Sequence, residues 1–477
     1  MSKLYIFGIG GTGSRVLRSL TMMLASGVKL GQGVDKVVPI IIDPDNSNAD
    51  LTRAVELMNS YSEVRKQLKF VEGAKSMFFK TEIEKILKNY TLPFQNIGDT
   101  SFESFIDISN LSREDQALTR MLFSEKNLSS IMDVGFKGNP NIGSVVLNQI
   151  FESDAFNDFA TSFGQGDRIF IVSSIFGGTG AAGFPMLLKS LRKSDWFNNH
   201  DIINKATIGA VTILPYFKVS NDSNQENEIN SATFISKAKS ALAYYEKNIS
   251  QNNSIDSLYF LADTPSKVYK YSVGGNTQEN AAHLIEYMAA SAIVDFTYKE
   301  LRDPEEDIVT ENFELGIRDL DGDINFTTFY DGLFDSLFEP MTQFVMLGNT
   351  LKDDFQFLKD VLAVTKPIAS SLYSSPFMRK LKQFTENYEI WLREMADNDR
   401  SLRLFNLDCK DKPFDVVNGI QEKKKFFEKN KNYNLVHARL GKKGEEAQKI
   451  VKDSNPSFFM EMFYLATKSL IEDKLNK

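Results

Sequence analysis

The chain has 477 residues, of which 42% are hydrophobic and 25% charged, and this is the composition of a folded globular protein with more than one structural region. Its 55 basic and 63 acidic residues give a net charge of -8, so the overall field repels nucleic acid and anionic membranes, and we expect neither as a direct partner. A single cysteine, Cys409, excludes an intrachain disulfide and a thiolate cluster and suits the reducing cytoplasm, while three scattered histidines offer no metal-ligand spacing.

The first predicted element is a buried strand at residues 3–7, followed by a glycine-rich turn at 8–13 and a helix from Ser14 to about residue 25. A second apolar strand at 37–42 ends directly before Asp43. Residues 44–130 have a helical pattern with charged faces, which predicts an insertion between strands.

The succession of strand, glycine turn and helix returns at residues 168–192, and apolar strands are predicted at 206–214 and 257–263. Strands that alternate with helices predict a mostly parallel sheet covered on both faces. Residues 277–296 are small and apolar almost all round, which is typical of a helix buried between two domains. Beyond about residue 335 the pattern is nearly all helical, and no run of about 18 apolar residues predicts a membrane span.

Two loops place glycines directly between an apolar strand and a helix. Such a junction presents free backbone N–H groups and the positive end of a helix dipole, and glycine lets a phosphate approach without a Cβ in the way. A tight turn without a ligand explains one such loop, whereas two in one sheet favour a phosphate site. The turn-rich residues 137–143 precede another apolar helix, which would let them fold over a terminal phosphate.

Four segments, GIGGTGSRVLRSL, KGNPNIG, FGGTGAAGFP and AVTILPY, resemble the tubulin/FtsZ superfamily in their order and context. The resemblance covers about residues 3–300 and is greatest to the divergent bacterial and phage branches. It implies a tubulin-like GTPase domain at 1–300, which includes the central helix and the insertion, and a divergent, mostly helical C-terminal domain at 301–477. It also implies GTP or GDP with Mg²⁺ as the ligand of a cytoplasmic protein that assembles into filaments or oligomers.

The resemblance further implies which residues contact the nucleotide. Phosphate contacts are expected from the two glycine loops, from acids after the second strand that act near the Mg²⁺, and from the KGNPNIG loop. The ribose is expected near one of two polar residues after AVTILPY, and the guanine edge at the start of the central helix. These positions are Gly10, Gly11, Thr12, Gly13, Asp43, Asp45, Gly138, Asn139, Pro140, Gly177, Gly178, Thr179, Gly180, Glu228 or Asn230, and Asn280.

The sequence departs from the family at the loop that supports hydrolysis. In the family, a loop with the pattern Asn-x-Asp-x-x-Asp positions water against the γ-phosphate held by the next subunit. The counterpart here keeps Asn325 but has Thr and Tyr at the two acidic positions, with Asp323 and Asp331 nearby. If GTP is hydrolysed, these three residues are expected to carry the reaction. A protein that binds nucleotide without turning it over is a serious competitor.

Two other classes of nucleotide-binding protein fit the first 55 residues. These residues also resemble the adenylating domain of ubiquitin-activating-like enzymes and Rossmann dinucleotide folds, in which an acid that ends the second strand binds ribose. Adenylating enzymes of that kind generally use cysteines, and the chain has only Cys409. Neither alternative gives the second glycine loop a role. Because the C-terminal region departs from the tubulin pattern, we expect a protein partner there.

Overall fold

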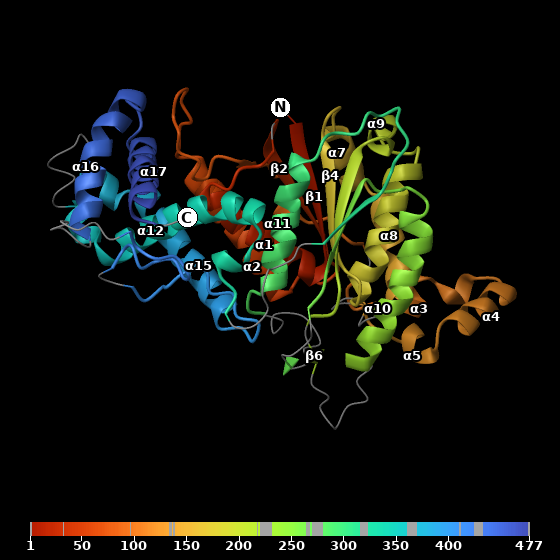
Figure 1. The fold of residues 1–477 in the computed structure, drawn as a ribbon. Helices are drawn as coiled ribbons and strands as arrows, with labels where there is room; N and C mark the ends of the chain where they lie inside the picture. Colours follow the sequence, from red (N-terminus) through yellow and green to blue (C-terminus); the bar gives the residue numbers. More distant parts are fainter. Residues whose placement is uncertain are drawn as a thin grey trace.

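The computed structural model describes residues 2–31, 33–95, 97–132, 136, 139–216, 218–219, 231–263, 268–269, 280–314, 323–359, 370–409, 412–423 and 433–475. Within these ranges, seven parallel strands form one sheet with helices on both faces, and the helices after residue 330 pack together beside it (Figure 1). The predicted α/β class with a mainly helical C-terminal region is confirmed.

The order of strands in the sheet is β3-β2-β1-β4-β5-β7-β9, and every neighbouring pair is parallel. The strands are β1 (Ser2–Ile9), β2 (Val34–Ile42), β3 (Glu82–Ile83), β4 (Arg168–Ser174), β5 (Thr207–Ile213), β7 (Ser257–Leu261) and β9 (Glu311–Glu314). A separate pair joins β6 (Lys218–Val219) to β8 (Val268–Tyr269). The chain proceeds from β1 to β2 in one direction and from β4 to β5 in the other, so the sheet has its topological switch point between β1 and β4, where ligands of open α/β sheets bind.

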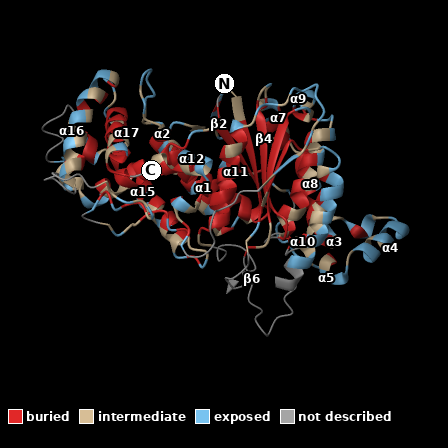
Figure 2. Cartoon of the chain, in the orientation of Figure 1, coloured by how far each residue is buried: buried red, intermediate tan, exposed pale blue. Residues whose placement is uncertain are grey.

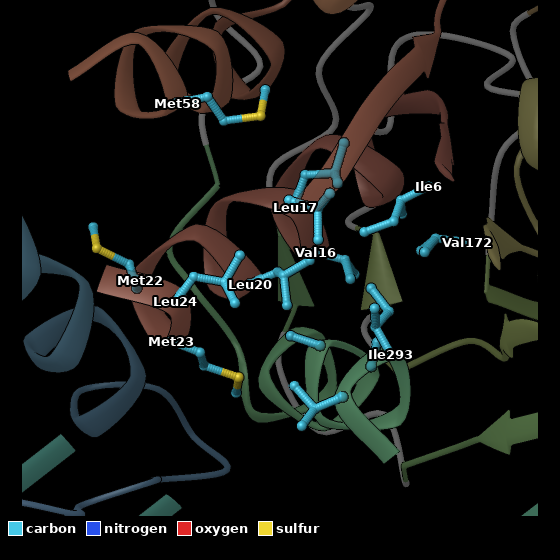
Figure 3. Packing of buried hydrophobic residues seen from close by; sticks show 14 of the residues in the cluster. Ile6, Val16, Leu17, Leu20, Met22, Met23, Leu24, Met58, Val172 and Ile293 are labelled. Atoms are coloured by element: carbon cyan, nitrogen blue, oxygen red, sulfur yellow. The ribbon is translucent and has the colours of Figure 1, made fainter. Parts of the chain in front are cut away.

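Different helices cover the two faces of the sheet. Helices α1 (Gly10–Ser26), α2 (Ala49–Arg65) and α11 (Leu284–Tyr298) lie on one face, and α6 (Pro140–Phe151), α7 (Asp154–Ser162) and α8 (Gly178–Lys193) lie on the other (Figure 1). Side chains of β1 alternate between the faces, as a strand requires. The rings of Tyr5 and Phe7 lie 5.3 and 5.0 Å from that of Phe159 on α7, whereas Ile6 points toward α1 (Figure 3).

The remaining helices lie outside these two layers. They are α3 (Phe102–Phe105), α4 (Arg113–Leu122), α5 (Glu125–Leu128), α9 (His200–Asn204), α10 (Ser231–Tyr245), α12 (Asp331–Asp353), α13 (Phe355–Phe357), α15 (Pro376–Ala396), α16 (Tyr433–Ile450) and α17 (Asn455–Lys474). Short 3-10 turns span Lys88–Tyr90, Ile108–Asn110, Phe326–Thr328 and Ser370–Ser374, and a π turn spans Glu246–Ser250. Across the helices that the structure describes, no segment has the length and apolar character that a membrane crossing requires.

Helix α1 is the centre of the core. It is buried over almost its whole length between the sheet, α2, α11 and α12, and Figure 2 shows the same burial along the strands behind it. Figure 3 shows Val16 of α1 between Ile6 of β1 and Ile293 of α11, with Leu20 one turn further along the helix. Burial of each such side chain stabilises the fold by about 1.5–3 kcal/mol, so the position of α1 is strongly determined.

Glycine is required where α1 turns back against β1. A Cβ on Gly13 would lie 2.3 Å from the carbonyl carbon of Gly8, which is a clash between two backbone segments that cannot rotate away. We therefore expect Gly13→Ala to lower the free energy of unfolding by about 2–3 kcal/mol, as overpacking of a core does. Urea titration measures this change. Gly98→Ala is the control, since a Cβ there meets nothing within 4 Å, and an equal loss in both variants would contradict the explanation.

Part of the expected insertion at 44–130 differs from the prediction. Residues 80–90 have a helical pattern, but they form the short strand β3 and a 3-10 turn. Tertiary contacts explain the difference, because Ile83 is buried at the sheet edge and the carboxylate of Glu84 pairs with Lys3 of β1 at 2.9 Å. Pairing with β2 outweighs the local preference for helix.

The central helix begins later than expected, and the sheet extends beyond residue 300. Helix α11 begins at Leu284 and not at 277, because a capping box at His283 starts it: Nδ1 of His283 accepts from Ile285 N, and Glu286 accepts from His283 N. Residues 277–279 lie outside the described residues. Strand β9 follows the expected domain boundary at residue 300 yet pairs with β7, so the sheet extends to residue 314.

Candidate functional site

The two glycine loops meet at the switch point. β1 and β4 are neighbours, and their registered pairs run from Leu4 with Arg168 to Gly8 with Val172, so the turns that follow them leave the same edge of the sheet side by side. Gly10 adopts a φ of +70°, and a Cβ built on it would lie 3.6 Å from Cβ of Thr179 in the second loop. The first turns of α1 and α8 are thus in van der Waals proximity.

These two helices begin without a side-chain cap. The N-cap residues are Ile9 for α1 and Gly177 for α8; neither side chain accepts a hydrogen bond, and neither helix has an acid in its first turn. Most other long helices are capped: the caps of α2, α7, α11, α15 and α17 are Asn48, Ser153, His283, Ser375 and Ser454. Helix α12 is a further long helix without a cap. Two adjacent, uncapped helix starts present backbone N–H donors and positive dipole ends to one point, which suits an anion.

A third helix start joins them. Helix α6 begins at Pro140 after Asn139, again without a side-chain cap. A Cβ on Gly143 would lie 3.1 Å from the carbonyl oxygen of Gly178 and 3.0 Å from Cβ of Ala182, so the first turn of α6 packs on that of α8. Residues 139–143 of the KGNPNIG segment are therefore brought to the glycine loops, whereas Lys137 and Gly138 lie outside the described residues.

The two acids after β2 are buried in a turn. Oδ1 of Asp43 accepts from the backbone N of Asp45 at 3.1 Å, and Oδ1 of Asp45 accepts from the backbone N of Ser47 at 3.1 Å and from its hydroxyl at 2.8 Å. β2 is the neighbour of β1, so this turn leaves the sheet beside the first glycine loop. Burial raises the pKa of Asp43 to about 7, against a lowering by the hydrogen bond from Asp45.

The raised pKa of Asp43 predicts a stability that depends on pH. Between pH 4 and 7 the folded protein keeps a proton on Asp43 that the unfolded chain loses, so the free energy of unfolding falls as pH rises through this window. The loss amounts to about 4 kcal/mol. In the ligand-free protein, Asp43→Asn should remove this decline. The control is Asp35→Asn, because Asp35 is exposed at the start of β2, and this variant should keep the decline. Urea unfolding at pH 4.5, 6 and 7.5 measures it, and an unchanged decline in Asp43→Asn would contradict the assignment.

A buried ionic network lies directly behind the first glycine loop. Arg15 of α1 donates from Nε to Glu286 of α11 at 2.5 Å and from Nη1 to Asp50 of α2 at 2.9 Å. Its Nη2 donates to the hydroxyl of Tyr216 at 2.8 Å and to that of Thr12 in the loop at 3.3 Å. Burial opposes the charge of Arg15, but Tyr216, Glu286 and Asp50 hold its pKa well above its usual value. The network fixes three helices relative to a loop residue.

The sequence interpretation missed this network, although a signal was present. Arg15 lies in a helix segment that is expected to be buried beside the sheet, and Glu286 lies in the apolar central helix. Charged residues are almost never fully buried unless they are paired, so two charges of opposite sign on helices expected in the core indicate an ion pair. Asp50 has no such signal, because it lies in a segment with charged faces.

The expected base-contacting residue belongs to the same network. Asn280 lies four residues before α11, where its backbone N donates to Oδ1 of Asp50 at 3.0 Å and its amide Nδ2 donates to Oδ2 at 2.7 Å. One N–H of the amide is thus engaged by Asp50, and its second N–H and its carbonyl oxygen remain for a base. The two ribose candidates, Glu228 and Asn230, lie outside the described residues.

Two of the three residues expected to support hydrolysis, Asp323 and Asn325, lie at the carboxyl edge of the sheet. Ile324, between Asp323 and Asn325, pairs with residues 401–403: its N donates to Ser401 at 3.0 Å, and it accepts from Arg403 N at 2.8 Å. The adjacent Arg400 binds Asp263, two residues after β7.

Their side chains have local partners. Asp323 pairs with Arg403 at 3.1 Å, and the side chain of Asn325 caps a 3-10 turn. Asp331 is the exposed first residue of α12. The side chains of Asp323 and Asn325 lie on the same edge of the sheet as the glycine loops and not at the opposite end.

Comparison with known proteins gives structural neighbours only. No protein family model and no curated protein matches the chain. Among solved structures, the chain is similar over 62% of its length to CetZ from Methanosaeta thermophila strain DSM 6194, at 15% identity and a TM-score of 0.30, covering 54% of that chain. It is also similar over 62% of its length to CetZ2 from Haloferax volcanii as a GTPγS-bound protofilament, at 13% identity and a TM-score of 0.30, and to CetZ1 from the same organism as a GDP-bound monomer, at 12% identity and a TM-score of 0.29, covering 58% of each chain.

The chain thus spans between half and two thirds of these structures. Similarity at these TM-scores says nothing about function. In fold, the chain has tubulin-like structural neighbours.

Proposed function

We propose that this protein binds the phosphates of a guanine nucleotide at the switch point and self-associates in the cytoplasm in its nucleotide-bound form. The observation that carries the proposal is the convergence of the uncapped starts of α1, α6 and α8 on one point at the carboxyl edge of the sheet. A phosphate chain supplies the acceptor oxygens and negative charge that these helix ends lack.

The guanine base and the assembly are the finer parts of the proposal. They are supported by the resemblance of GIGGTGSRVLRSL, KGNPNIG and FGGTGAAGFP to the tubulin/FtsZ loops, and the phosphate contacts are assigned to the residues named for them above. Asn280, through its side-chain amide, is assigned to the base, and Glu228 or Asn230 to the ribose. A protein partner for the C-terminal helical domain belongs to the same proposal.

We assign Mg²⁺ to the side of the phosphates next to β2. Asp43 and Asp45 offer hard carboxylate oxygens there, of the kind that Mg²⁺ prefers. Mg²⁺ is commonly held by one or two carboxylates together with phosphates and water. When bound, the ion would neutralise phosphate charge.

The geometry favours nucleotide binding without rapid turnover. A head-to-tail polymer can complete its site across subunits only if the supporting loop lies at the end opposite the nucleotide. Here Asp323 and Asn325 lie on the same edge as the glycine loops and are engaged by local partners. Any GTPase activity is therefore expected not to depend on them.

Substitution of the two acids tests this point. We expect Asp323→Ala and Asp331→Ala to release phosphate from GTP at the wild-type rate within about twofold, because Asp323 is paired with Arg403 on the edge that carries the glycine loops and Asp331 is exposed at the start of α12. A malachite-green assay at protein concentrations that span assembly measures the rate. A tenfold lower rate in either variant would instead support hydrolysis by these acids, as in the tubulin/FtsZ family.

Titration calorimetry on nucleotide-stripped protein tests the binding proposal, with GDP, GTP, ADP, ATP and NAD⁺ as ligands. We expect GDP and GTP to bind in the presence of Mg²⁺ and the adenine compounds to bind at least about tenfold more weakly, and we expect GTP to increase light scattering. ATP consumption with pyrophosphate release, or preference for NAD⁺, would favour the Rossmann-type alternatives, whose sheet order the chain shares.

A further inference from the structure

The segment Asn280–His283, which leads into α11, is held by side chains from other elements. Its backbone carries no strand pairing, so its polar groups need partners. The N and O of Asn280 bond to Asp50 at 3.0 Å and to Arg53 at 3.1 Å, both from α2. The N and O of Ala282 bond to Glu394 at 2.9 Å and to Asn398 at 3.2 Å, at the end of α15. The C-terminal domain thus supplies half of these bonds.

Glu394 is the point where this C-terminal helix meets the helices behind the glycine loop. Its carboxylate accepts from Arg18 of α1 at 2.7 Å and from Arg53 of α2 at 2.5 Å, besides the backbone of Ala282. Arg18 lies one turn after Arg15, and Arg53 one turn after Asp50. One mostly buried carboxylate therefore fixes α1, α2 and the segment before α11 relative to one another.

The side chains around Glu394 are closely packed. Trp391, one turn earlier on α15, is fully buried, and its Nε1 donates to Ser19 of α1 at 3.3 Å. The ring of Trp391 lies 6.1 Å from that of Tyr287 on α11. If nucleotide binding moves α1 or the Asn280 segment, α15 must therefore move with it.

We propose that Glu394 is a positioning residue for the nucleotide site, through which affinity for the nucleotide depends on the docking of α15. The proposal rests on the function proposed above. The two arginines repel each other without the carboxylate between them, and the segment that carries Asn280 loses an anchor. By linkage, a nucleotide that needs this arrangement must in turn stabilise the end of α15 against local opening.

The test compares Glu394→Gln with Glu389→Gln in the full-length protein. Glu389 lies on the same helix with similar exposure, but it pairs with Lys352 and Arg393 and does not contact α1 or α2. GDP affinity is measured by calorimetry, and the stability of the ligand-free protein by urea unfolding. We expect Glu394→Gln to weaken GDP binding at least about tenfold, as loss of a charge-assisted hydrogen bond does, and Glu389→Gln to change it by less than about twofold.

A second measurement uses the wild-type protein, so it does not depend on whether a variant folds. Amide hydrogen exchange at residues 390–398 should slow when GDP is added. Lower stability of Glu394→Gln with unchanged GDP affinity, or exchange at 390–398 that GDP does not alter, would overturn the positioning role while leaving the proposed function intact. Failure of the wild type to bind GDP would overturn both.

Discussion

A Thr179→Glu variant is expected to fold as well as the wild type and to lose nucleotide binding almost completely. Thr179 lies in the first turn of α8, which has no acid, and a carboxylate there interacts favourably with the helix dipole by about 0.3–1 kcal/mol. The same carboxylate would lie where a phosphate is proposed to bind. Two like charges about 4 Å apart repel by about 4 kcal/mol near a protein surface, so affinity for GDP should fall at least about a hundredfold.

Thr179→Gln is the matched control, because glutamine has the same shape without the charge. It should bind GDP within about tenfold of the wild type, and both variants should keep the wild-type free energy of unfolding within about 1 kcal/mol. Calorimetric titration and urea unfolding give the two quantities. If Thr179→Glu bound GDP as well as Thr179→Gln, the phosphates would lie elsewhere.

The second large effect is expected at Arg15. Arg15→Met keeps much of the side-chain volume but leaves the carboxylates of Asp50 and Glu286 buried without their common partner. Breaking a buried ion pair from one side costs about 3–5 kcal/mol, because an uncompensated charge remains in the interior. Unfolding in urea should show this loss at pH 7.

A triple variant separates the charge from the packing. Arg15→Met combined with Asp50→Asn and Glu286→Gln removes all three charges together, and we expect it to recover most of the lost stability. If the triple variant were less stable than Arg15→Met alone, the network would contribute through its hydrogen bonds and not through charge balance. The comparison also tests whether α1 and α11 are joined by Arg15.

The strands and the glycine loops could be predicted from the sequence because their signals are local. The apolar runs at 3–7 and 37–42 and the glycines between strand and helix each lie within about fifteen residues, and the structure extends these strands by only a few residues. A site formed by the ends of two adjacent strands can then be predicted as well, because neighbouring parallel strands have their carboxyl ends at the same edge of the sheet.

Features that depend on distant contacts could not be predicted. Residues 80–90 have helical periodicity, but Glu84 and Ile83 are bound by β1 and β2. Asn280 and Glu394 are more than a hundred residues apart, and no local pattern indicates that α15 reaches the start of α11. The placement of Asp323 near the end of β7 similarly depends on pairing with residues 401–403, which the sequence does not reveal.

Backbone hydrogen exchange with and without GDP is the most direct test of the central claim, because the phosphates are proposed to bind the N–H groups at the starts of α1 and α8. We predict that GDP slows exchange at residues 10–14 and at residues 178–181 together, and that Thr179→Glu abolishes both effects. Slowed exchange at only one of these helix starts, or only at distant segments, would contradict the account.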